Sequence, residues 1–429
     1  MRYLYSVLYY CLLPIILLRM LLRSRAAPAY RRRLAQRLGF FDATALSKES
    51  PTIWLHAVSV GEALAAGPLI ESLLQSYPNH ALVVTTTTPT GSERVTALFG
   101  ERVFHVYAPW DVPGAVKRFL SHIRPKLLII METELWPNMV HHCHRQGCRI
   151  ILANARMSER SARGYARLSG LSGSMLAALD IVACQNRTDG DRFLKLGLKT
   201  SQLEVTGSIK FDLELDAVLR AQSTELRSSW SIDQRSVIVA ASTHPGEDEQ
   251  ILRAFAEVRA AVDNCLLVIV PRHPERFDSV FELCIAGGWQ VQRRSRRAEL
   301  TPADDILLGD SMGELLLLLS GATVAVIGGS LVNHGGHNVL EAAAWGVPVV
   351  TGPYMFNFAE ISDLLSAAGA MEQLDAVDDL STCLIQLLAD PAKRRDMGTA
   401  GQRVVADNRG AKKRLLTLID DQLRPSIKQ

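Results

Sequence analysis

The chain of 429 residues is 48% hydrophobic and 21% charged, a balance typical of a globular protein of two or three domains. This composition excludes a disordered, collagenous or polytopic membrane chain. The formal net charge is +3, but residues 1–41 contain eight Arg and no acidic residue, while the rest of the chain carries 39 Lys and Arg against 44 Asp and Glu. The basic N-terminal end predicts an anionic partner, either a membrane or a nucleic acid.

The first helix expected in the chain is apolar. Residues 3–18 (YLYSVLYYCLLPIILL) hold no charge, and the Arg-rich residues 19–37 follow. A cleaved signal peptide carries its charge before the apolar stretch, so this segment predicts a membrane anchor. It either spans the bilayer or lies in the interface, and a buried helix of a soluble domain is the third possibility. The Arg residues that follow it suit anionic lipids and favour a cytoplasmic location for the remaining chain. The seven Cys are scattered and form no Cys-x-x-Cys pair, which indicates free thiols in a reducing cytoplasm.

From about residue 50, short apolar runs alternate with helical segments, which predicts parallel strands buried on both faces. The first series of strands is expected at residues 52–57, 81–86, 126–131, 149–153, 181–184 and 203–205, with a helix over 61–74. A polar, acidic stretch from Lys210 to about Ser231 is interpreted as an interdomain connection. The second series is expected at 236–241, 265–270, near Val291, 306–308, 323–327 and 348–351. Two such series predict two α/β domains, with ligands at the carboxyl ends of the strands in an interdomain cleft.

Polar side chains follow three strands of the first series. Glu62 in HAVSVGE falls in the first turn of a helix, where it is either a general base or only a cap for the helix dipole. Glu132 and Glu134 in METELWPN point to opposite faces if their strand continues, so at most one is expected to face a substrate; loop hydrogen bonds are the alternative. Lys210 in TGSIKFD follows a glycine turn and either stabilises negative charge or is a solvated surface residue.

Two motifs of the second series indicate an anion site. In PRHPER, Arg272 and His273 follow a strand and precede a proline, and Arg suits bidentate contact with phosphate or carboxylate. In IGGSLVNHGGHNVLEA, glycines precede a helix expected to begin near Asn338, and Glu341 is placed to accept hydrogen bonds from ribose hydroxyls. A purely structural glycine turn is the alternative. Neither a Walker loop nor G-x-G-x-x-G is present, which disfavours NTP hydrolysis and dinucleotide binding.

The segment HHCHRQGC, residues 141–148, invites a metal interpretation. It falls in a helix between two predicted strands, and its irregular spacing matches no common zinc pattern. We therefore expect no metal there. Nucleic-acid binding is also disfavoured, because the basic cluster adjoins an apolar helix and lacks interleaved aromatic residues on its charged side.

Taken together, the motifs resemble those of the Kdo transferases of Gram-negative bacteria, which are membrane-associated glycosyltransferases of the GT-B fold. The matching stretches run in order along nearly the whole chain: YRRRLAQRLG, WLHAVSVGE, ETELWPN, ANARMSERS, TGSIKFD, PRHPER, MGEL, GGSLVNHGGHNVLEAA and MFNF. One departure is Ser311, where the family commonly has Thr after the Asp. The resemblance implies transfer of Kdo, an acidic eight-carbon sugar, from CMP-Kdo to the lipid A precursor in lipopolysaccharide core biosynthesis at the inner membrane.

The resemblance also implies a domain plan. We expect an anchor and Arg-rich segment over residues 1–40, an acceptor-binding Rossmann-like domain over 41–215 and a CMP-sugar-binding Rossmann-like domain over 216–405. Residues 406–429 are expected to form a helix that packs back on the N-terminal domain.

The family's functional residues map onto matching positions of this chain. Glu62 would be the proton acceptor from the acceptor hydroxyl, and Glu132 and Lys210 would stabilise the transition state. The residues implied in CMP binding are Pro271, Arg272, Met312, Gly313, Glu314, Asn338, Val339, Leu340 and Glu341. The resemblance implies no metal or other cofactor, since GT-B enzymes usually need none.

The implied roles agree with the chemistry of the residues. A carboxylate base suits an acceptor hydroxyl, which loses its proton as it attacks. Nearby carboxylates favour the oxocarbenium-like character that the sugar develops. Arg272 offsets the negative charge of the leaving phosphate. Attack on the opposite face predicts inversion at the anomeric carbon. Two alternatives stay open: another membrane-associated GT-B enzyme with a UDP-sugar and a lipid-linked acceptor, and a membrane-tethered nucleotide sensor without catalysis.

Overall fold

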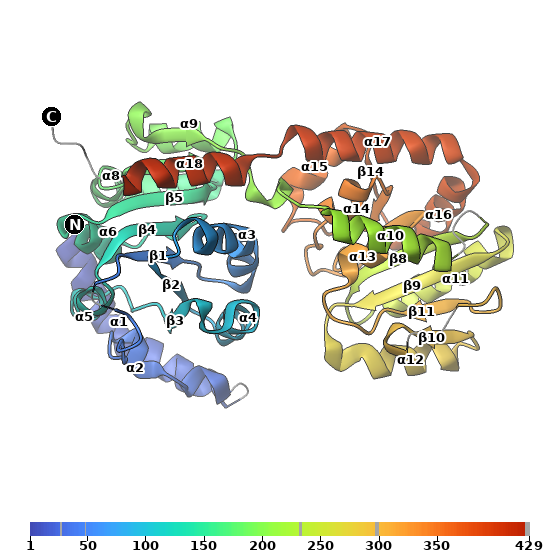
Figure 1. The fold of residues 1–429 in the computed structure, drawn as a ribbon, viewed down its shortest axis with the longest axis horizontal. Helices are drawn as coiled ribbons and strands as arrows, with labels where there is room; N and C mark the ends of the chain where they lie inside the picture. The colour runs from blue at the N-terminus through green and yellow to red at the C-terminus, as the bar shows by residue number, and fades with distance from the viewer. Residues whose placement is uncertain (26–27, 48, 231–233, 297–299, 425–429) are drawn as a thin grey trace. The chain divides into compact units, whose positions relative to one another are not determined.

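A computed structural model of the protein describes residues 1–25, 28–47, 49–230, 234–296 and 300–424. The chain divides into two compact units (Figure 1). Unit 1 comprises Met1–Asp212 and Arg409–Gln429, and unit 2 comprises Leu213–Asn408. These divisions lie three residues from the predicted boundaries at 215/216 and 405/406. Residues 1–40, which were expected to be a separate segment, belong to unit 1.

Unit 1 is built on a parallel seven-stranded sheet with the order β3-β2-β1-β4-β5-β6-β7. Its strands are β1 Thr52–His56, β2 Ala81–Thr86, β3 Phe104–Tyr107, β4 Pro125–Met131, β5 Arg149–Ala155, β6 Ile181–Cys184 and β7 Leu203–Val205. The six predicted strands are confirmed, but β3 was missed. It is a four-residue edge strand whose first half is only partly buried, so it lacks the continuous apolar run that identifies inner strands.

Helices cover both faces of this sheet. They are α1 Arg2–Arg23, α2 Leu34–Arg37, α3 Val60–Ser76, α4 Pro89–Phe99, α5 Pro113–Ile123, α6 Pro137–Arg145, α7 Glu159–Arg167, α8 Ser169–Leu176, α9 Arg187–Lys195 and α18 Ala411–Leu423. One core joins the sheet to α5, α6, α8 and α9, and a second core on the opposite face joins it to α3, α4 and α18. Alternate residues of β1 separate accordingly: Trp54 enters the first core, whereas Ile53 and Leu55 enter the second.

The C-terminal helix α18 belongs to unit 1 although 196 residues of unit 2 precede it. It contacts α3, β4 and β5, and it buries Leu415 and Ile419 completely (Figure 1). The carboxylate of Asp212 accepts hydrogen bonds from the backbone N–H groups of Gly410 at 2.6 Å and Lys412 at 2.5 Å. These bonds satisfy N–H groups at the start of α18 and tie the two chain segments of unit 1 together.

Unit 2 has a second parallel seven-stranded sheet, with the order β10-β11-β9-β8-β12-β13-β14. Its strands are β8 Ser236–Thr243, β9 Cys265–Pro271, β10 Val291–Arg293, β11 Ile306–Leu308, β12 Val324–Ile327, β13 Val349–Thr351 and β14 Met371–Gln373. All six predicted strands are present. The missed strand, β14, is again a short edge strand with exposed positions.

The helices of unit 2 include one that the sequence analysis did not expect. They are α10 Ala217–Ser229, α11 Asp248–Ala261, α12 Phe277–Ala286, α13 Leu315–Leu319, α14 Leu340–Trp345, α15 Ala359–Ala367, α16 Leu380–Ala389 and α17 Pro391–Asp407. The stretch interpreted as an interdomain connection contains α10, so that prediction is wrong; its expected end, Ser231, lies outside the described residues. Asp216 caps α10 by accepting from the Leu219 N–H at 2.7 Å, and Leu226 is buried.

Helix α1 is long and apolar enough to cross a membrane by length and composition. Its N-terminal half is bonded to the rest of unit 1. Arg2 Nη1 and Ser6 Oγ donate to Asn138 Oδ1 at 3.0 and 3.1 Å, and the Gly114 N–H donates to Tyr10 Oη at 3.2 Å. The remaining circumference exposes a set of large apolar side chains: Tyr3, Leu4, Val7, Leu8, Leu12, Ile15, Leu18, Leu21 and Leu22.

Candidate active site

The carboxyl edge of the unit 1 sheet carries the three residues for which catalytic roles are expected. Glu62 follows β1, Glu132 follows the neighbouring strand β4, and Lys210 follows β7 in a short 3-10 turn, Ile209–Phe211. Because all strands run parallel, their carboxyl ends meet at the same edge. The structure brings Glu132 and Lys210 together, with Glu132 Oε1 4.0 Å from Lys210 Nζ.

Glu62 lies in the first turn of α3, as expected, and the side chain of Ser59 caps that helix. Its carboxylate accepts from the Val58 N–H at 2.7 Å and from Ser59 Oγ at 2.8 Å, while Ser59 Oγ accepts from the Glu62 N–H at 3.2 Å. The Ser59 hydroxyl thus caps the helix and also holds the Glu62 carboxylate. The position of Glu62 in the first turn is confirmed, and its role, as a base or only as a cap for the helix dipole, stays a prediction.

The environment of Glu62 tunes its acidity. The residue is only 8% exposed, and this burial, together with the nearby carboxylates of Glu134 and Glu132, raises the pKa of Glu62 to about 7. The hydrogen bonds from Val58 and Ser59 oppose that rise because they favour the charged form. A carboxylate with a pKa near neutrality is suited to taking a proton at physiological pH.

Glu132 and Glu134 do not point to opposite faces of a continuing strand. Strand β4 ends at Met131, and Glu132 leaves it in the left-handed conformation with a φ of 56°. Glu134 then accepts from Trp136 Nε1 at 3.1 Å, and burial raises its pKa. Both carboxylates are near enough to affect Glu62. The alternation argument fails here because it holds only within a strand.

Sequence reasoning missed Asn154 as a positioning residue of this site. Asn154 is 1% exposed, has a φ of 52°, and its Oδ1 accepts from the Ile209 N–H at 3.1 Å. It thereby fixes the turn that carries Lys210. The available signal was an Asn immediately before the end of a buried strand in ANARMSERS, since Asn tolerates the left-handed region better than most residues.

The expected nucleotide-binding residues lie at the carboxyl edge of the unit 2 sheet, after β9, β11 and β12. Pro271 ends β9, and the N–H of Arg272 donates to the carbonyl of Thr243 at 3.0 Å. Within the described part of the chain, the Arg272 guanidinium has no hydrogen-bond or ion-pair partner, and its charge acts on the carboxyl of Glu341. Arg272 is therefore a cation available for an anionic ligand.

The segment after β11 places Met312, Gly313 and Glu314 at the same edge. Met312 is 59% exposed, and Gly313 has a φ of +85°. Glu314 accepts from Ser311 Oγ and from Arg294, whose Nη2 lies 3.1 Å from Glu314 Oε1. An exposed Met and a glycine in the left-handed region suit the close approach of a flat ring to the backbone.

The segment after β12 forms a short helix, α14, that begins at Leu340, within two residues of the predicted start near Asn338. The Asn338 side chain is bonded to its first turn: Oδ1 accepts from the Leu340 N–H at 3.1 Å, and Nδ2 donates to Glu341 Oε1 at 3.0 Å. Burial raises the pKa of Glu341, while Asn338 and Arg272 oppose the rise. Val339 and Leu340 bury their side chains in the core. The Val339 carbonyl accepts from the Ala343 N–H at 3.2 Å, so the expected contacts of these two residues with CMP stay predictions.

Glu247, which the sequence analysis did not single out, organises the glycine-rich loop. Its buried carboxylate accepts from the N–H groups of His244 at 2.8 Å, Gly329 at 2.7 Å and Leu331 at 2.9 Å. The loop also needs glycine at position 328, where a Cβ would meet the Ser242 carbonyl oxygen at 2.4 Å. The signal for Glu247 was an acid soon after a strand in STHPGE, a pattern that resembles SVGE in unit 1.

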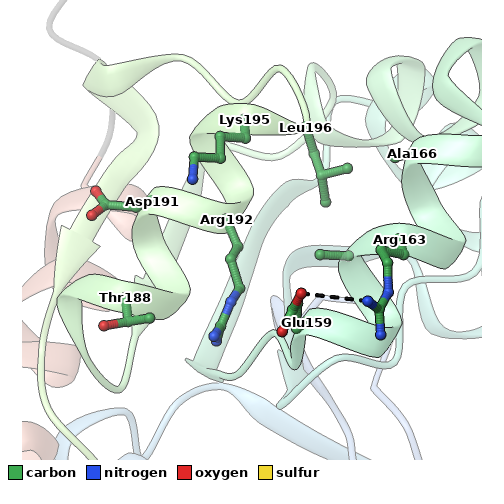
Figure 2. A pocket seen from close by; sticks show the side chains of 9 residues that line it. Glu159, Arg163, Ala166, Thr188, Asp191, Arg192, Lys195 and Leu196 are labelled. Atoms are coloured by element: carbon green, nitrogen blue, oxygen red, sulfur yellow. Dashed lines mark hydrogen bonds and ion pairs between the residues drawn. The ribbon is translucent and has the colours of Figure 1, made fainter.

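A surface pocket of about 510 Å³ lies between α7 and α9 of unit 1 (Figure 2). Two of its arginines are paired locally: Arg163 with Glu159 at 3.4 Å (Figure 2), and Arg192 with the neighbouring Asp189 at 3.1 Å. None of the expected catalytic residues lines it.

Residues 141–145 of HHCHRQGC lie in α6, as expected. In the described part of the chain no group of three His, Cys, Asp or Glu side chains is placed to hold a metal ion, and independence from metal stays a prediction.

Comparisons with known proteins agree with this architecture. Residues 32–213 match the family model described as 3-deoxy-D-manno-octulosonic-acid transferase (kdotransferase), and residues 244–404 match glycosyl transferases group 1. UDP-GlcNAc 2-epimerase from Neisseria meningitidis, solved with UDP-GlcNAc, shares the fold with a TM-score of 0.56 at 13% identity, over 86% of this chain and 100% of that one. The two Rossmann-like units have the GT-B fold, and the two family models class the chain as a glycosyltransferase.

Two curated relatives identify the family. The 3-deoxy-D-manno-octulosonic acid transferase of Haemophilus influenzae is 42% identical over 99% of this chain and 100% of its own length. The enzyme of that name from Bordetella pertussis is 37% identical over 96% of this chain and 97% of its own length. The chain belongs to the family of 3-deoxy-D-manno-octulosonic acid (Kdo) transferases.

Proposed function

We propose that this protein transfers Kdo from CMP-Kdo to a hydroxyl of the lipid A precursor, with inversion at the anomeric carbon, in lipopolysaccharide core biosynthesis. Within a chain of the Kdo transferase family, the observation that carries the proposal is Glu62: a buried carboxylate whose pKa of about 7 suits a base, at the same sheet edge as Glu132 and Lys210. Family membership supports the transferred sugar; the donor and the acceptor rest on the motif resemblance.

In this mechanism Glu62 takes the proton of the acceptor hydroxyl as its oxygen attacks the anomeric carbon. A bond forms between these two atoms, and the bond from that carbon to the phosphate oxygen of CMP breaks. The single displacement inverts the configuration. Glu132 and Lys210 stabilise the charge that develops in the transition state.

The leaving CMP carries away the electron pair of the broken bond. Arg272, a cation without a partner in the described part of unit 2, offsets the charge of that phosphate. Glu341 would accept from the ribose hydroxyls, and Met312 and Gly313 would lie against the base. The proposed meeting of the two groups of residues in an interdomain cleft stays a prediction.

A transfer assay tests the proposal. The full-length protein is incubated in mixed micelles with a tetra-acylated lipid A precursor and CMP-Kdo made in situ, and products are read by mass spectrometry. We expect a mass gain of one or more Kdo units. Transfer from a UDP-sugar to a lipid-linked acceptor, with none from CMP-Kdo, would replace this proposal with another GT-B activity.

We further propose that α1 holds the enzyme on the cytoplasmic face of the inner membrane by lying in the interface. The helix has one side bonded to unit 1 from Arg2 to Tyr10 and exposes apolar side chains around the rest. A spanning helix would have to give up these polar contacts. An interfacial helix keeps them and buries its apolar face among acyl chains, next to Arg residues that suit anionic head groups.

Replacing Leu8 and Ile15 of α1 by Glu is expected to abolish membrane binding. Leu8 is 54% and Ile15 is 62% exposed, so the charges oppose lipid insertion without disturbing the core. Cosedimentation with vesicles containing 30% anionic lipid should fall at least about tenfold. Val218→Glu, on the exposed side of α10 in unit 2, is the control, since Val218 is 66% exposed. Unchanged sedimentation of the α1 variant would contradict the anchor proposal.

A further inference from the structure

Four histidines that no proposed role has yet used gather at the carboxyl edge of the unit 2 sheet. His244 follows β8, His273 follows β9, and His334 and His337 follow β12. The ring centroid of His244 lies 4.2 Å from that of His334, 5.0 Å from that of His337 and 5.6 Å from that of His273. His244 is 8% exposed and forms the floor of the cluster with the half-buried His337, while His273 and His334 form an exposed rim.

The two floor histidines share a proton. His244 Nε2 and His337 Nε2 are 2.7 Å apart, a distance that requires one N–H between them, because two N–H groups or two lone pairs would repel. The pair can accept one more proton without losing this contact, since the added proton goes to Nδ1 of the donating ring. Both Nε2 atoms cannot bind one zinc ion in this arrangement, because zinc–nitrogen distances of about 2.0–2.1 Å in a tetrahedral site need a wider separation.

The loops on either side of the pair hold it in place. The backbone of His244 donates to Glu247, and the Gly336 N–H donates to the Gly329 carbonyl at 2.8 Å. A Cβ at position 329 would lie 3.1 Å from the His337 ring, so the loop packs directly against that ring. The pair is therefore a preorganised part of the glycine-rich loop.

Charged groups of both signs surround the pair. Those from the three loops facing it are Arg272, His273, Glu275 and Arg276 after β9, Glu247 and Asp248 after β8, and His334 and Glu341 after β12. Arg276 pairs with Asp248, and the Glu247 oxygens are taken by backbone N–H groups. Arg272 has no side-chain partner among the described residues. With the histidines neutral, these groups carry two positive charges, on Arg272 and Arg276, and four negative ones, so the unpaired Arg272, and not a net positive charge, is what attracts an anion here.

We infer that the His244–His337 pair, with Arg272, binds the phosphate of the donor nucleotide, and that the pair takes up one proton when this anion binds. The inference rests on the proposed function, which places a nucleotide at this edge. His244 and His337 are then ligands of the phosphate, and the affinity of the protein for the donor depends on pH.

The direction of the effect follows from the electrostatics. Burial and then the neighbouring cations lower the pKa of His244 to about 4 and that of His337 to about 3. A unit negative charge about 4 Å away, at an effective dielectric of about 20, is worth about three pKa units. The bound anion therefore raises the pKa of the pair. Because binding adds a proton, affinity rises as pH falls, by up to about tenfold per pH unit.

Calorimetry with the full-length protein and cytidine 5′-methyl phosphate tests this inference. The probe is a phosphodiester, so it lacks the second phosphate ionisation near pH 6 that CMP would contribute. Binding heats in buffers of different ionisation enthalpy give the number of protons taken up. We expect an uptake of up to about one proton, which declines as the pH is raised from 6 to 8.

His244→Gln and His337→Gln are expected to remove the uptake and leave weaker, pH-independent binding, whereas the exposed His144→Gln in unit 1 should behave as wild type. Binding by the wild-type protein without proton uptake, or uptake that persists in both cluster variants, would overturn the inference and leave the proposed donor intact. If the folded wild-type protein binds neither this probe nor CMP, the donor assignment itself fails, and the inference fails with it.

Discussion

The variant Glu62→Gln is expected to lose Kdo transfer by about 10²–10⁴-fold in kcat, which is the usual contribution of a positioned general base. Gln has the same shape: its oxygen can accept from the Val58 N–H while its amide NH2 donates to Ser59 Oγ, but it cannot take a proton at neutral pH. The measurement is single-turnover transfer at saturating CMP-Kdo and lipid acceptor, so that product release does not mask the chemical step.

The pH profile gives a second readout of the same residue. Burial and the adjacent acids raise the pKa of Glu62 to about 7, and the base is active only as the carboxylate. The wild-type rate should therefore rise about tenfold per pH unit below 7 and level off above it, and the residual rate of Glu62→Gln should lack this step.

The variant Ser59→Ala separates capping from catalysis. It removes the hydroxyl that bonds both the Glu62 carboxylate and the Glu62 N–H, at a cost of about 1 kcal/mol of stability, but it leaves the carboxylate in place. If Glu62→Gln retains transfer within about threefold of wild type while Ser59→Ala loses stability, Glu62 is only a helix cap.

The variant Lys210→Met is expected to lower kcat by about 10²–10³-fold, the effect typical of removing one group that stabilises transition-state charge. Met keeps the apolar stem and removes only the ammonium 4.0 Å from Glu132. Lys210→Arg restores a charge but not its position, so its rate should lie between those of Lys210→Met and the wild type.

Two observations decide whether Lys210 has this role. The exposed Lys195→Met on α9, a change of the same chemistry away from the sheet edge, should leave kcat unchanged. A Lys210→Met variant with normal kcat and a raised KM would instead assign the ammonium to ground-state binding of substrate.

The sequence by itself determined the two sheets and most of their strands. Inner parallel strands are buried on both faces, so KLLIIM and CLLVIV read as continuous apolar runs, whereas the edge strands β3 and β14 are short and partly exposed and were not detected. Helix α10 was missed because its exposed side is polar and its packing on α13 is not visible in composition.

The sequence predicted residues of the candidate site only where the recognisable motif and the functional side chain lie in the same chain segment. Glu62, Glu132, Lys210, Arg272 and Glu341 each follow a strand within a recognisable motif. Parallel topology then places all strand ends of one unit at one edge, which is why these predictions fall at the two carboxyl edges of the sheets.

Only the tertiary structure decided how segments that are distant in sequence alter one another's pKa values and hydrogen bonds. The pKa of Glu62 depends on burial and on carboxylates some 70 residues away along the chain. The turn of Lys210 depends on Asn154, and the proton shared by His244 and His337 depends on two loops that meet at a distance of 2.7 Å. Acidity and hydrogen bonding are set by distance and by exclusion of water, and neither is encoded in the spacing of residues along one segment.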